Sequence, residues 1–163
     1  MKNQNLKELL SNIPVNIEGM IRFQGIKLDK NAHLADGLSG EIRKLNEGEY
    51  QISVQASEHY YRKRFTMAHE LGHFLLHKDK IGDGVNDTPA YRTYEKAELF
   101  NSNITAEHES EANAFAAALL MPKEAIEYYV REEGKSIKEM TSIFQMSERA
   151  LGIRIKNLGL KTN

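Results

Sequence analysis

The sequence predicts an α+β fold that is mostly helical and contains one small β-sheet. Apolar residues recur every three to four positions in several segments, most clearly in 64–77 and 106–120, which is the spacing of one helix face. Tyr50, Ile52 and Val54 instead alternate with polar residues, which is the pattern of a half-buried strand. A chain of 163 residues, 40% of them hydrophobic, is long enough to bury a core.

The N-terminal part is expected to begin with a helix and to continue as strands. Its first apolar residues have helical spacing: Leu6, Leu9, Leu10 and Ile13. Pro14 ends this helix. We expect residues 17–55 to form strands, the clearest being 40–45 and 50–55, which a turn at 46–48 connects.

Residues 64–77 contain the H-E-x-x-H pattern at His69-Glu70-Leu71-Gly72-His73, a spacing typical of zinc peptidases. Two histidines four positions apart lie on one face of a helix, so both imidazoles can reach the same metal ion. Glu70 lies beside them and can take a proton from a metal-bound water. The pattern therefore predicts a catalytic metal site on this helix.

The helix over 64–77 has two different sides. One side is polar and carries Thr66, His69, Glu70, His73 and His77. The opposite side is apolar and carries Met67, Ala68, Leu71 and Leu75. We expect the apolar side to be buried and the polar side to face a cleft. His77 lies roughly 12 Å along the helix axis from His69, so we interpret it as a C-terminal residue favoured by the helix dipole.

A long loop and a second strong helix follow. Residues 78–104 are rich in Gly, Asp, Asn and Thr, and loops of this length are commonly functional. The second helix is expected at 106–120, with Thr105 as its N-cap and Met121-Pro122 as its end. We interpret His108 as a solvated residue of its first turn.

This second helix is expected to supply the third metal ligand. Because the chain has no cysteine, the ligands must be histidine and carboxylate. Glu109 and Asn113 share one face, whereas Glu111 points about 200° away from Glu109, so only one of the two carboxylates should face the first helix. We favour Glu109, because Ala116 and Ala117 on its side allow two helices to approach; Glu111 is the alternative. Asn113 is expected to hold one histidine ring through its second nitrogen.

The C-terminal third is expected to form short helices at 123–132, 136–144 and 147–158, with Gly134 and Gly159 between or after them. The pattern of residues from 136 to 158 is similar to a helix-turn-helix. From Arg149 onward the charged residues are all basic: Arg149, Arg154, Lys156 and Lys161.

We favour a helical hairpin packed on protein over a DNA-binding helix. Its expected core residues are Ile137, Met140, Phe144 and Ile153. Thr141 and Gln145 occupy places where DNA-binding motifs usually carry Ala and Gly, and Gly152 would weaken a recognition helix by ~1 kcal/mol.

Composition excludes some functional classes. A net charge of −1, from 22 basic and 23 acidic residues, gives no general attraction to nucleic acid or anionic lipid. The longest apolar run, Ala114 to Met121, is far shorter than the ~20 residues that span a bilayer, and the N-terminus lacks the apolar core of a signal peptide. We expect a cytoplasmic protein without membrane association.

Three segments resemble the ImmA/IrrE family of metallopeptidases. The segment from Arg64 to His77 resembles the signature helix of the family. Residues 109–122 resemble its second motif, E-x-E-A-N-x-F-A-x-x-L-L-M-P, and residues 89–92 resemble a short stretch that often precedes it. The resemblance covers about residues 38 to 160.

The resemblance implies a zincin-like peptidase, similar to gluzincins, whose small twisted sheet packs on the H-E-x-x-H helix. We therefore expect a peptidase core at 1–122 and a C-terminal helical segment at 123–163. It further implies one zinc ion per chain on His69, His73 and Glu109, with Glu70 as the general base. Members of the family characteristically cleave helix-turn-helix transcriptional repressors, and some are encoded beside such a repressor as toxin-antitoxin-like pairs.

Two further expectations concern the reaction. An oxyanion formed during peptide hydrolysis needs a donor, for which Tyr91, Arg92 and Tyr94 are candidates. If the strand at 50–55 lies at the sheet edge, an extended substrate can pair with it.

The alternative function is a regulatory module that holds zinc without catalysis and acts by binding protein or DNA.

Overall fold

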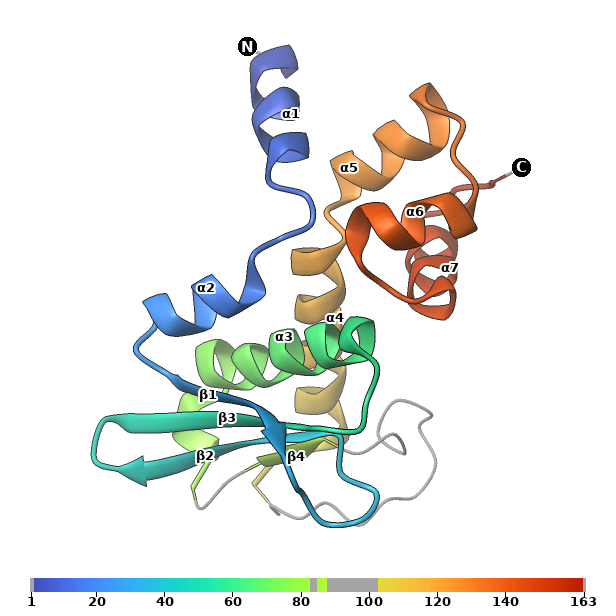
Figure 1. The fold of residues 1–163 in the computed structure, drawn as a ribbon. Coiled ribbons are helices and arrows are strands. Elements are labelled where there is room, and N and C mark those ends of the chain that lie inside the picture. The colour runs from blue at the N-terminus through green and yellow to red at the C-terminus, as the bar shows by residue number, and fades with distance from the viewer. Residues whose placement is uncertain (1, 83–84, 88–102, 163) are drawn as a thin grey trace. The chain divides into compact units, whose positions relative to one another are not determined.

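The computed structural model describes residues 2–82, 85–87 and 103–162. The chain forms two compact units, one made of residues 17–116 and the other of residues 1–16 together with 117–163. This division differs from the expected one after residue 122, because the N-terminal helix groups with the C-terminal segment. The mixture of helices with one small sheet confirms the predicted α+β class (Figure 1).

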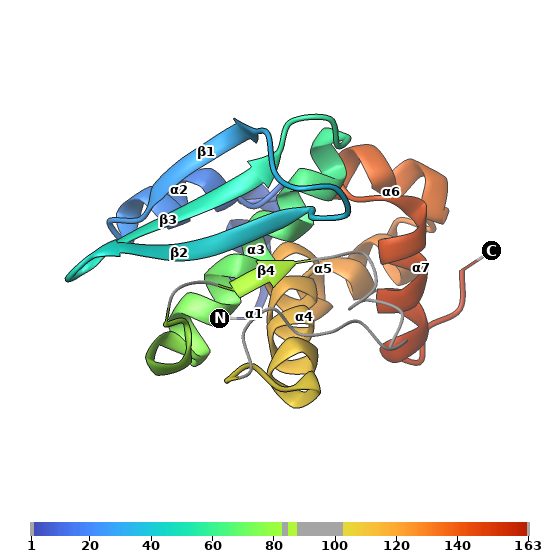
Figure 2. The ribbon, with the colours of Figure 1, turned by 90° about the horizontal axis from the view of Figure 1, so that it is seen from below.

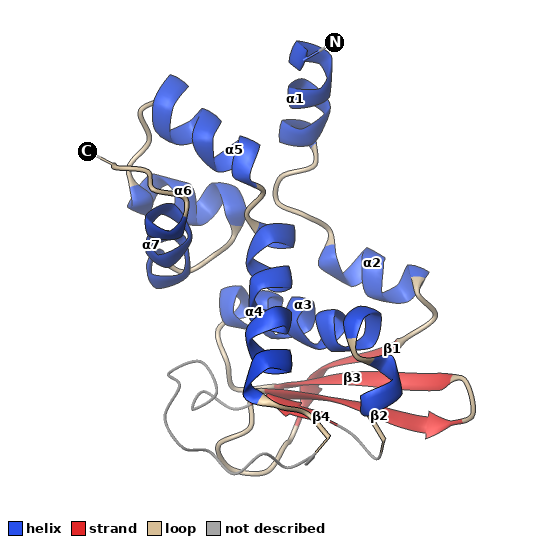
Figure 3. Ribbon diagram, turned by 180° about the vertical axis from the view of Figure 1, so that it is seen from behind, coloured by secondary structure: helices blue, strands red, loops and turns tan. Residues whose placement is uncertain are grey.

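The unit of residues 17–116 consists of a sheet with helices on one face (Figures 1 and 3). Its elements, in chain order, are α2 (Ile17–Phe23), β1 (Lys27–Ala32), β2 (Gly40–Asn46), β3 (Glu49–Gln55), α3 (Tyr60–Leu76), the 3-10 helix η1 (Lys78–Lys80), β4 (Val85–Asp87) and α4 (Ala106–Leu120), whose last residues belong to the other unit.

The sheet is mixed, with the strand order β1-β3-β2-β4 (Figure 2). β1 pairs in parallel with β3, and β2 pairs antiparallel with both β3 and β4. The β2–β3 hairpin confirms the two predicted strands and their turn, in which Gly48 has φ +78°. β3 lies between β1 and β2, so the strand at 50–55 is an inner strand and the condition for pairing with a substrate, a place at the sheet edge, is not met.

Residues 17–23 form helix α2 rather than the expected strand. Ile17 and Ile21 are four positions apart and are both fully buried. This spacing places them on one face of a helix, but it would also place them on one face of a strand, so the pair alone does not distinguish the two. Glu18 in the first turn and Arg22 in the last form an ion pair of 3.2 Å that supports the helix.

The core of this unit lies between the sheet and α3. Ile42, Ile52 and Val54 of the sheet are fully buried, as are Met67 and Ala68 of the helix. α3 begins at Tyr60, four residues before the expected start, because the ring of His59 accepts a hydrogen bond from the backbone N–H of Tyr61 and caps the helix. Histidine is an unusual N-cap, so this start of the helix has no clear signal in the sequence.

β2 approaches α3 closely at Gly40. A Cβ atom at Gly40 would overlap Cγ2 of Thr66 and would lie 3.1 Å from the carbonyl oxygen of Ser53. Only glycine fits here, and the contact fixes the height of α3 above the sheet.

The second unit is helical. It contains α1 (Lys2–Ser11), the end of α4, α5 (Lys123–Glu127), the π-helix η3 (Tyr128–Glu132), α6 (Ile137–Phe144) and α7 (Glu148–Asn157). The helices predicted at 123–132, 136–144 and 147–158 are confirmed within one or two residues. Ser136 and Glu139 form a capping box at the start of α6, and Ser147 caps α7.

The core of α6 and α7 agrees with the expected one in part. Met140 and Phe144 are buried as expected and Ile137 is half-buried, but Ile153 is 53% exposed, and Leu151 and Ile155 of α7 are buried instead. Leu151 and Ile155 are four positions apart and share one face of the helix, which turns Ile153 away from it.

None of the helices in the described part of the chain combines the length and apolar character needed to cross a membrane.

Candidate metal centre

α3 and α4 cross at a point where both helices carry small residues (Figure 3). A Cβ atom at Gly72 would lie 3.0 Å from Cδ1 of Phe115 and 3.3 Å from Cα of Ala112. Ala112 and Ala116 are fully buried. Small residues do bring the two helices together, as expected, and the close approach is between Gly72 and Ala112.

This crossing brings together three side chains that could hold a metal ion: His69, His73 and Glu109. Nε2 of His69 lies 3.1 Å from Nε2 of His73 and 3.1 Å from Oε2 of Glu109. Nε2 of His73 lies 3.2 Å from Oε1 of Glu109. Zinc ligands at 2.0–2.1 Å in a tetrahedron are separated by about 3.3 Å, so these spacings match three corners of such a site.

The hydrogen bonding of this group also fits a cation. Oε2 of Glu109 is buried and accepts no hydrogen bond of good geometry from any described residue. Nδ1 of His69 lies 2.9 Å from Oδ1 of Asn113. An amide oxygen only accepts, so Nδ1 of His69 donates and its Nε2 keeps a lone pair directed at the other ligands.

The protonation states of Glu109 and His73 also favour a metal site. Burial on its own would raise the pKa of Glu109, but its interactions with the close rings of His69 and His73 lower it to about 2. Burial lowers the pKa of His73 below 6.5, against an opposing effect of Glu109. At neutral pH the carboxylate is therefore ionised and the His73 ring is neutral, which are the forms that bind metal.

The polar side of α3 is buried in the described part of the structure, whereas we expected it to face a cleft. Thr66, His69, Glu70 and His73 are all fully buried, whereas Leu75 on the apolar side is 45% exposed. The reason is that α4 and β2 cover the polar side. Glu70 lies next to Gly40 of β2, since a Cβ atom there would lie 3.8 Å from Oε1 of Glu70.

Glu111 also reaches α3, so the expectation that only one carboxylate can do so is wrong. Its Oε2 atom lies 2.7 Å from Nε2 of His77, which caps the C-terminus of α3 and is 3% exposed. Directions around α4 alone do not reveal this contact, because it depends on His77, which lies one turn beyond His73 at the end of α3. His77 is therefore a buried, hydrogen-bonded residue and not simply a helix-dipole residue.

The sequence matches the family described as the IrrE N-terminal-like domain, a family of peptidases, over residues 26–156. The chain belongs to this family. No curated protein matches the chain. Membership of a peptidase family, together with the buried group of His69, His73 and Glu109, indicates a metal-dependent protease.

Some residues expected at this peptidase site lie outside the described part of the chain. They are the candidate oxyanion donors Tyr91, Arg92 and Tyr94, together with Pro89 of the preceding stretch. Their roles stay predictions.

The start of α4 is close to the prediction. Oγ1 of Thr105 accepts a hydrogen bond from the backbone N–H of His108, so Thr105 is the N-cap. His108 is half-buried rather than fully solvated, because its ring packs against that of His77 with 4.7 Å between the centroids.

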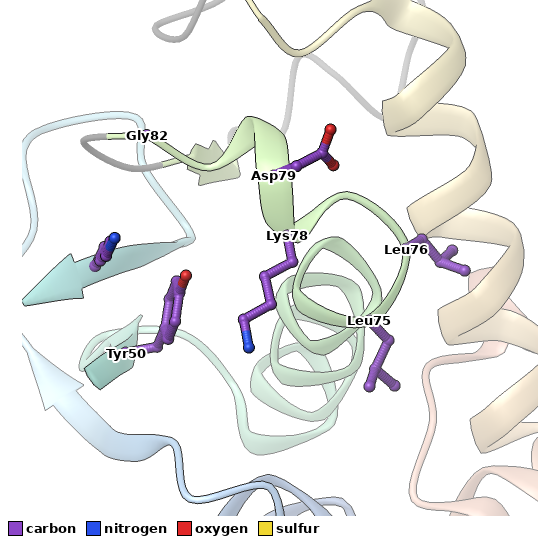
Figure 4. Close-up of a pocket in the computed structure, with 7 residues that line it drawn as sticks. Tyr50, Leu75, Leu76, Lys78, Asp79 and Gly82 are labelled. Carbon is purple, nitrogen blue, oxygen red and sulfur yellow. The ribbon is translucent and has the colours of Figure 1, made fainter. Parts of the chain in front are cut away.

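Figure 4 shows a hollow that is separate from the candidate metal centre. It measures about 620 Å³ and its lining residues are Lys44, Tyr50, Leu75, Leu76, Lys78, Asp79 and Gly82. The ammonium of Lys78 lies over the rings of Phe74 and Tyr50, at 4.6 and 5.3 Å from their centroids. The side chains of Leu75 and Leu76 point away from Tyr50, and none of the three candidate metal ligands lines the hollow.

Proposed function

We propose that the protein is a zinc-dependent endopeptidase that hydrolyses a peptide bond in a helix-turn-helix transcriptional repressor or an antitoxin-like partner. The observation that carries the reaction type is the convergence of two imidazole nitrogens of α3, the helix that also carries Glu70, with the carboxylate of Glu109 on α4, at 3.1–3.2 Å. Three protein ligands leave one corner of a tetrahedron open for water, which is the arrangement of catalytic rather than structural zinc sites.

The donor set favours zinc. Two neutral imidazoles and one carboxylate suit zinc, and the absence of cysteine excludes a thiolate site. When bound, zinc would lower the pKa of a coordinated water to about 7 and polarise the substrate carbonyl.

Glu70 is the proposed general base. It follows His69 directly on α3, and its side chain is fully buried. A buried carboxylate beside the metal ligands can take the proton from the attacking water and pass it to the leaving amine. Asn113 meanwhile holds the ring of His69 in the tautomer that offers Nε2.

The proposed substrate class rests on the resemblance of the two long motifs to the ImmA/IrrE family. A repressor of this kind acts in the cytoplasm, which is where we place the protein. The absence of cysteine is compatible with a reducing compartment.

The proposal is tested by incubating the zinc-loaded protein with the helix-turn-helix repressor encoded nearest to its gene, with and without a chelator. We expect mass spectrometry to show two repressor fragments only when zinc is present. Glu70→Gln should keep the zinc, because it leaves all three ligands in place, but should lose cleavage. Cleavage by Glu70→Gln would reject the proposed base.

The alternative function, a regulatory module that holds zinc and acts by binding, predicts a different outcome. The repressor would remain intact, and a stable complex or a salt-dependent shift of DNA would be observed instead. A buried glutamate beside the ligands argues against this alternative, because a structural zinc site needs no base.

A further inference from the structure

A third buried histidine, His77, extends the candidate metal centre. His77 lies one turn after His73, and its Nδ1 atom is 3.1 Å from Nδ1 of His73. Its other nitrogen, Nε2, is 2.7 Å from Oε2 of Glu111 on α4. The side chain of His77 is 4% exposed, whereas that of Glu111 is 51% exposed. The three residues thus form a continuous chain from the ligand His73 to a carboxylate at the surface.

The carboxylate of Glu111 determines where each proton lies in this series of hydrogen bonds. A carboxylate only accepts hydrogen bonds, so Nε2 of His77 must carry a proton. In neutral His77 the other nitrogen, Nδ1, then has a lone pair and must accept from His73. Nδ1 of His73 therefore donates, and Nε2 of His73 keeps the lone pair that a metal ion needs.

The opposite arrangement would block the site. If Nδ1 of His77 carried the proton, it would donate to Nδ1 of His73. The proton of neutral His73 would then lie on Nε2, which is the atom that faces His69 and Glu109. In neutral His77, which has a single ring proton, Glu111 prevents this arrangement because its hydrogen bond requires that proton on Nε2.

We propose that His77 and Glu111 are positioning residues that hold His73 in its metal-binding tautomer. Asn113 has the same function for His69, by a direct hydrogen bond. One segment of α4, from Glu109 to Asn113, would then supply a metal ligand and both ligand-orienting groups. This inference rests on the metal site of the proposed function, but it concerns metal binding and not the identity of the substrate.

A purely structural role for His77 would be served by other parts of the residue. The capping hydrogen bond at the end of α3 is made by its backbone N–H to the carbonyl of His73. Its ring also packs against His108. His77→Phe keeps both the backbone bond and an aromatic ring, but it removes the acceptor for His73.

The test measures zinc affinity by competition with a chelating dye, on the full chain. We expect His77→Phe to bind zinc about 10- to 100-fold more weakly than the natural protein. His77→Asn, which can still accept from His73, should recover part of this loss. Glu111→Ala should also weaken binding. The matched control is Glu107→Ala, which removes the same charge from an exposed position in the first turn of α4 and should leave affinity unchanged.

Nitrogen-15 NMR of the histidine rings gives a readout that packing alone would not move. In the zinc-free protein we expect His73 to be protonated on Nδ1 only, and in His77→Phe and Glu111→Ala we expect protonation on Nε2 to appear. Unchanged zinc affinity in His77→Phe, or the same His73 tautomer in all variants, would overturn the inference. A natural protein that binds no zinc would overturn both proposals. One that binds zinc as described without cleaving any repressor would overturn only the proposed function.

Discussion

Oδ1 of Asn113 lies 2.9 Å from Nδ1 of His69, across the crossing of α4 and α3. The two residues are 44 positions apart in the sequence, so this contact depends on the packing of the two helices. It directs the lone pair of His69 at Glu109 and His73, and it couples the geometry of the metal site to the approach of the helices.

Replacing Asn113 by leucine should weaken zinc binding. The substitution removes the acceptor that fixes the ring of His69, and losses of this kind are about 10- to 100-fold in metal affinity. Isothermal titration calorimetry measures the change. Asn113→Asp keeps an acceptor in the same place and should bind zinc at least as well as the leucine variant. Equal affinity of Asn113→Leu and the natural protein would show that the contact does not orient the ligand.

Zinc should stabilise the unit of residues 17–116, which holds all three proposed ligands. A ligand that binds only the folded state at a hundred times its Kd adds about 2.7 kcal/mol to the free energy of unfolding. Differential scanning calorimetry with added zinc and with chelator measures this difference. In Glu109→Gln, which removes the ligand carboxylate, the increase should be largely lost. An increase of the same size in that variant would mean that zinc binds elsewhere.

Two glycine substitutions form a matched pair. Gly72 and Gly152 both lie inside helices, where alanine is favoured by about 1 kcal/mol. A Cβ atom at Gly152 meets nothing closer than Cδ1 of Ile137 at 3.9 Å, so Gly152→Ala should stabilise the protein by roughly this amount.

A Cβ atom at Gly72 would lie 3.3 Å from Cα of Ala112, and this backbone can give way only if α4 shifts. We therefore expect Gly72→Ala to weaken zinc binding without the gain in stability seen for Gly152→Ala. Urea denaturation and zinc titration of both variants provide the comparison. A Gly72→Ala variant that gains stability and keeps its zinc affinity would contradict the importance of this close approach.

Glu18 should make stability depend on pH. Burial on its own would raise the pKa of Glu18, but hydrogen bonds from Lys30 and Tyr60 and the charges of Lys30 and Arg22 lower it below 4.5. A carboxyl group with a lowered pKa in the folded state contributes stability above pH 4.5, and this contribution is lost as the pH falls through the folded-state value.

Glu18→Gln should therefore lower the free energy of unfolding at pH 7 by less than about 1 kcal/mol, as expected for a partly exposed ion pair. The difference from the natural protein should shrink in denaturation experiments at progressively lower pH. Glu47→Gln, at an exposed position in the β2–β3 turn, is the control and should show no such trend. A constant difference at all pH values would indicate that packing and not charge causes the effect.

The sequence by itself determined the elements whose signals are local. α4 has the predicted bounds, because the hydroxyl of Thr105 caps its start and Pro122 cannot continue it. The β2–β3 hairpin could also be predicted from the sequence, since alternating apolar and polar residues and the turn residue Gly48 indicate it within a few positions. The spacing of His69 and His73 likewise required only the geometry of one helix.

Only the tertiary structure decided which side chains meet across elements. It showed that the polar side of α3 is buried under α4 and β2, and that Glu111 contacts His77 while Glu109 contacts His69 and His73. These outcomes depend on how closely Gly72 and Gly40 let neighbouring backbones approach and at what angle the helices cross. Periodicity along one segment carries no information about either quantity, because both arise from packing between segments far apart in the chain.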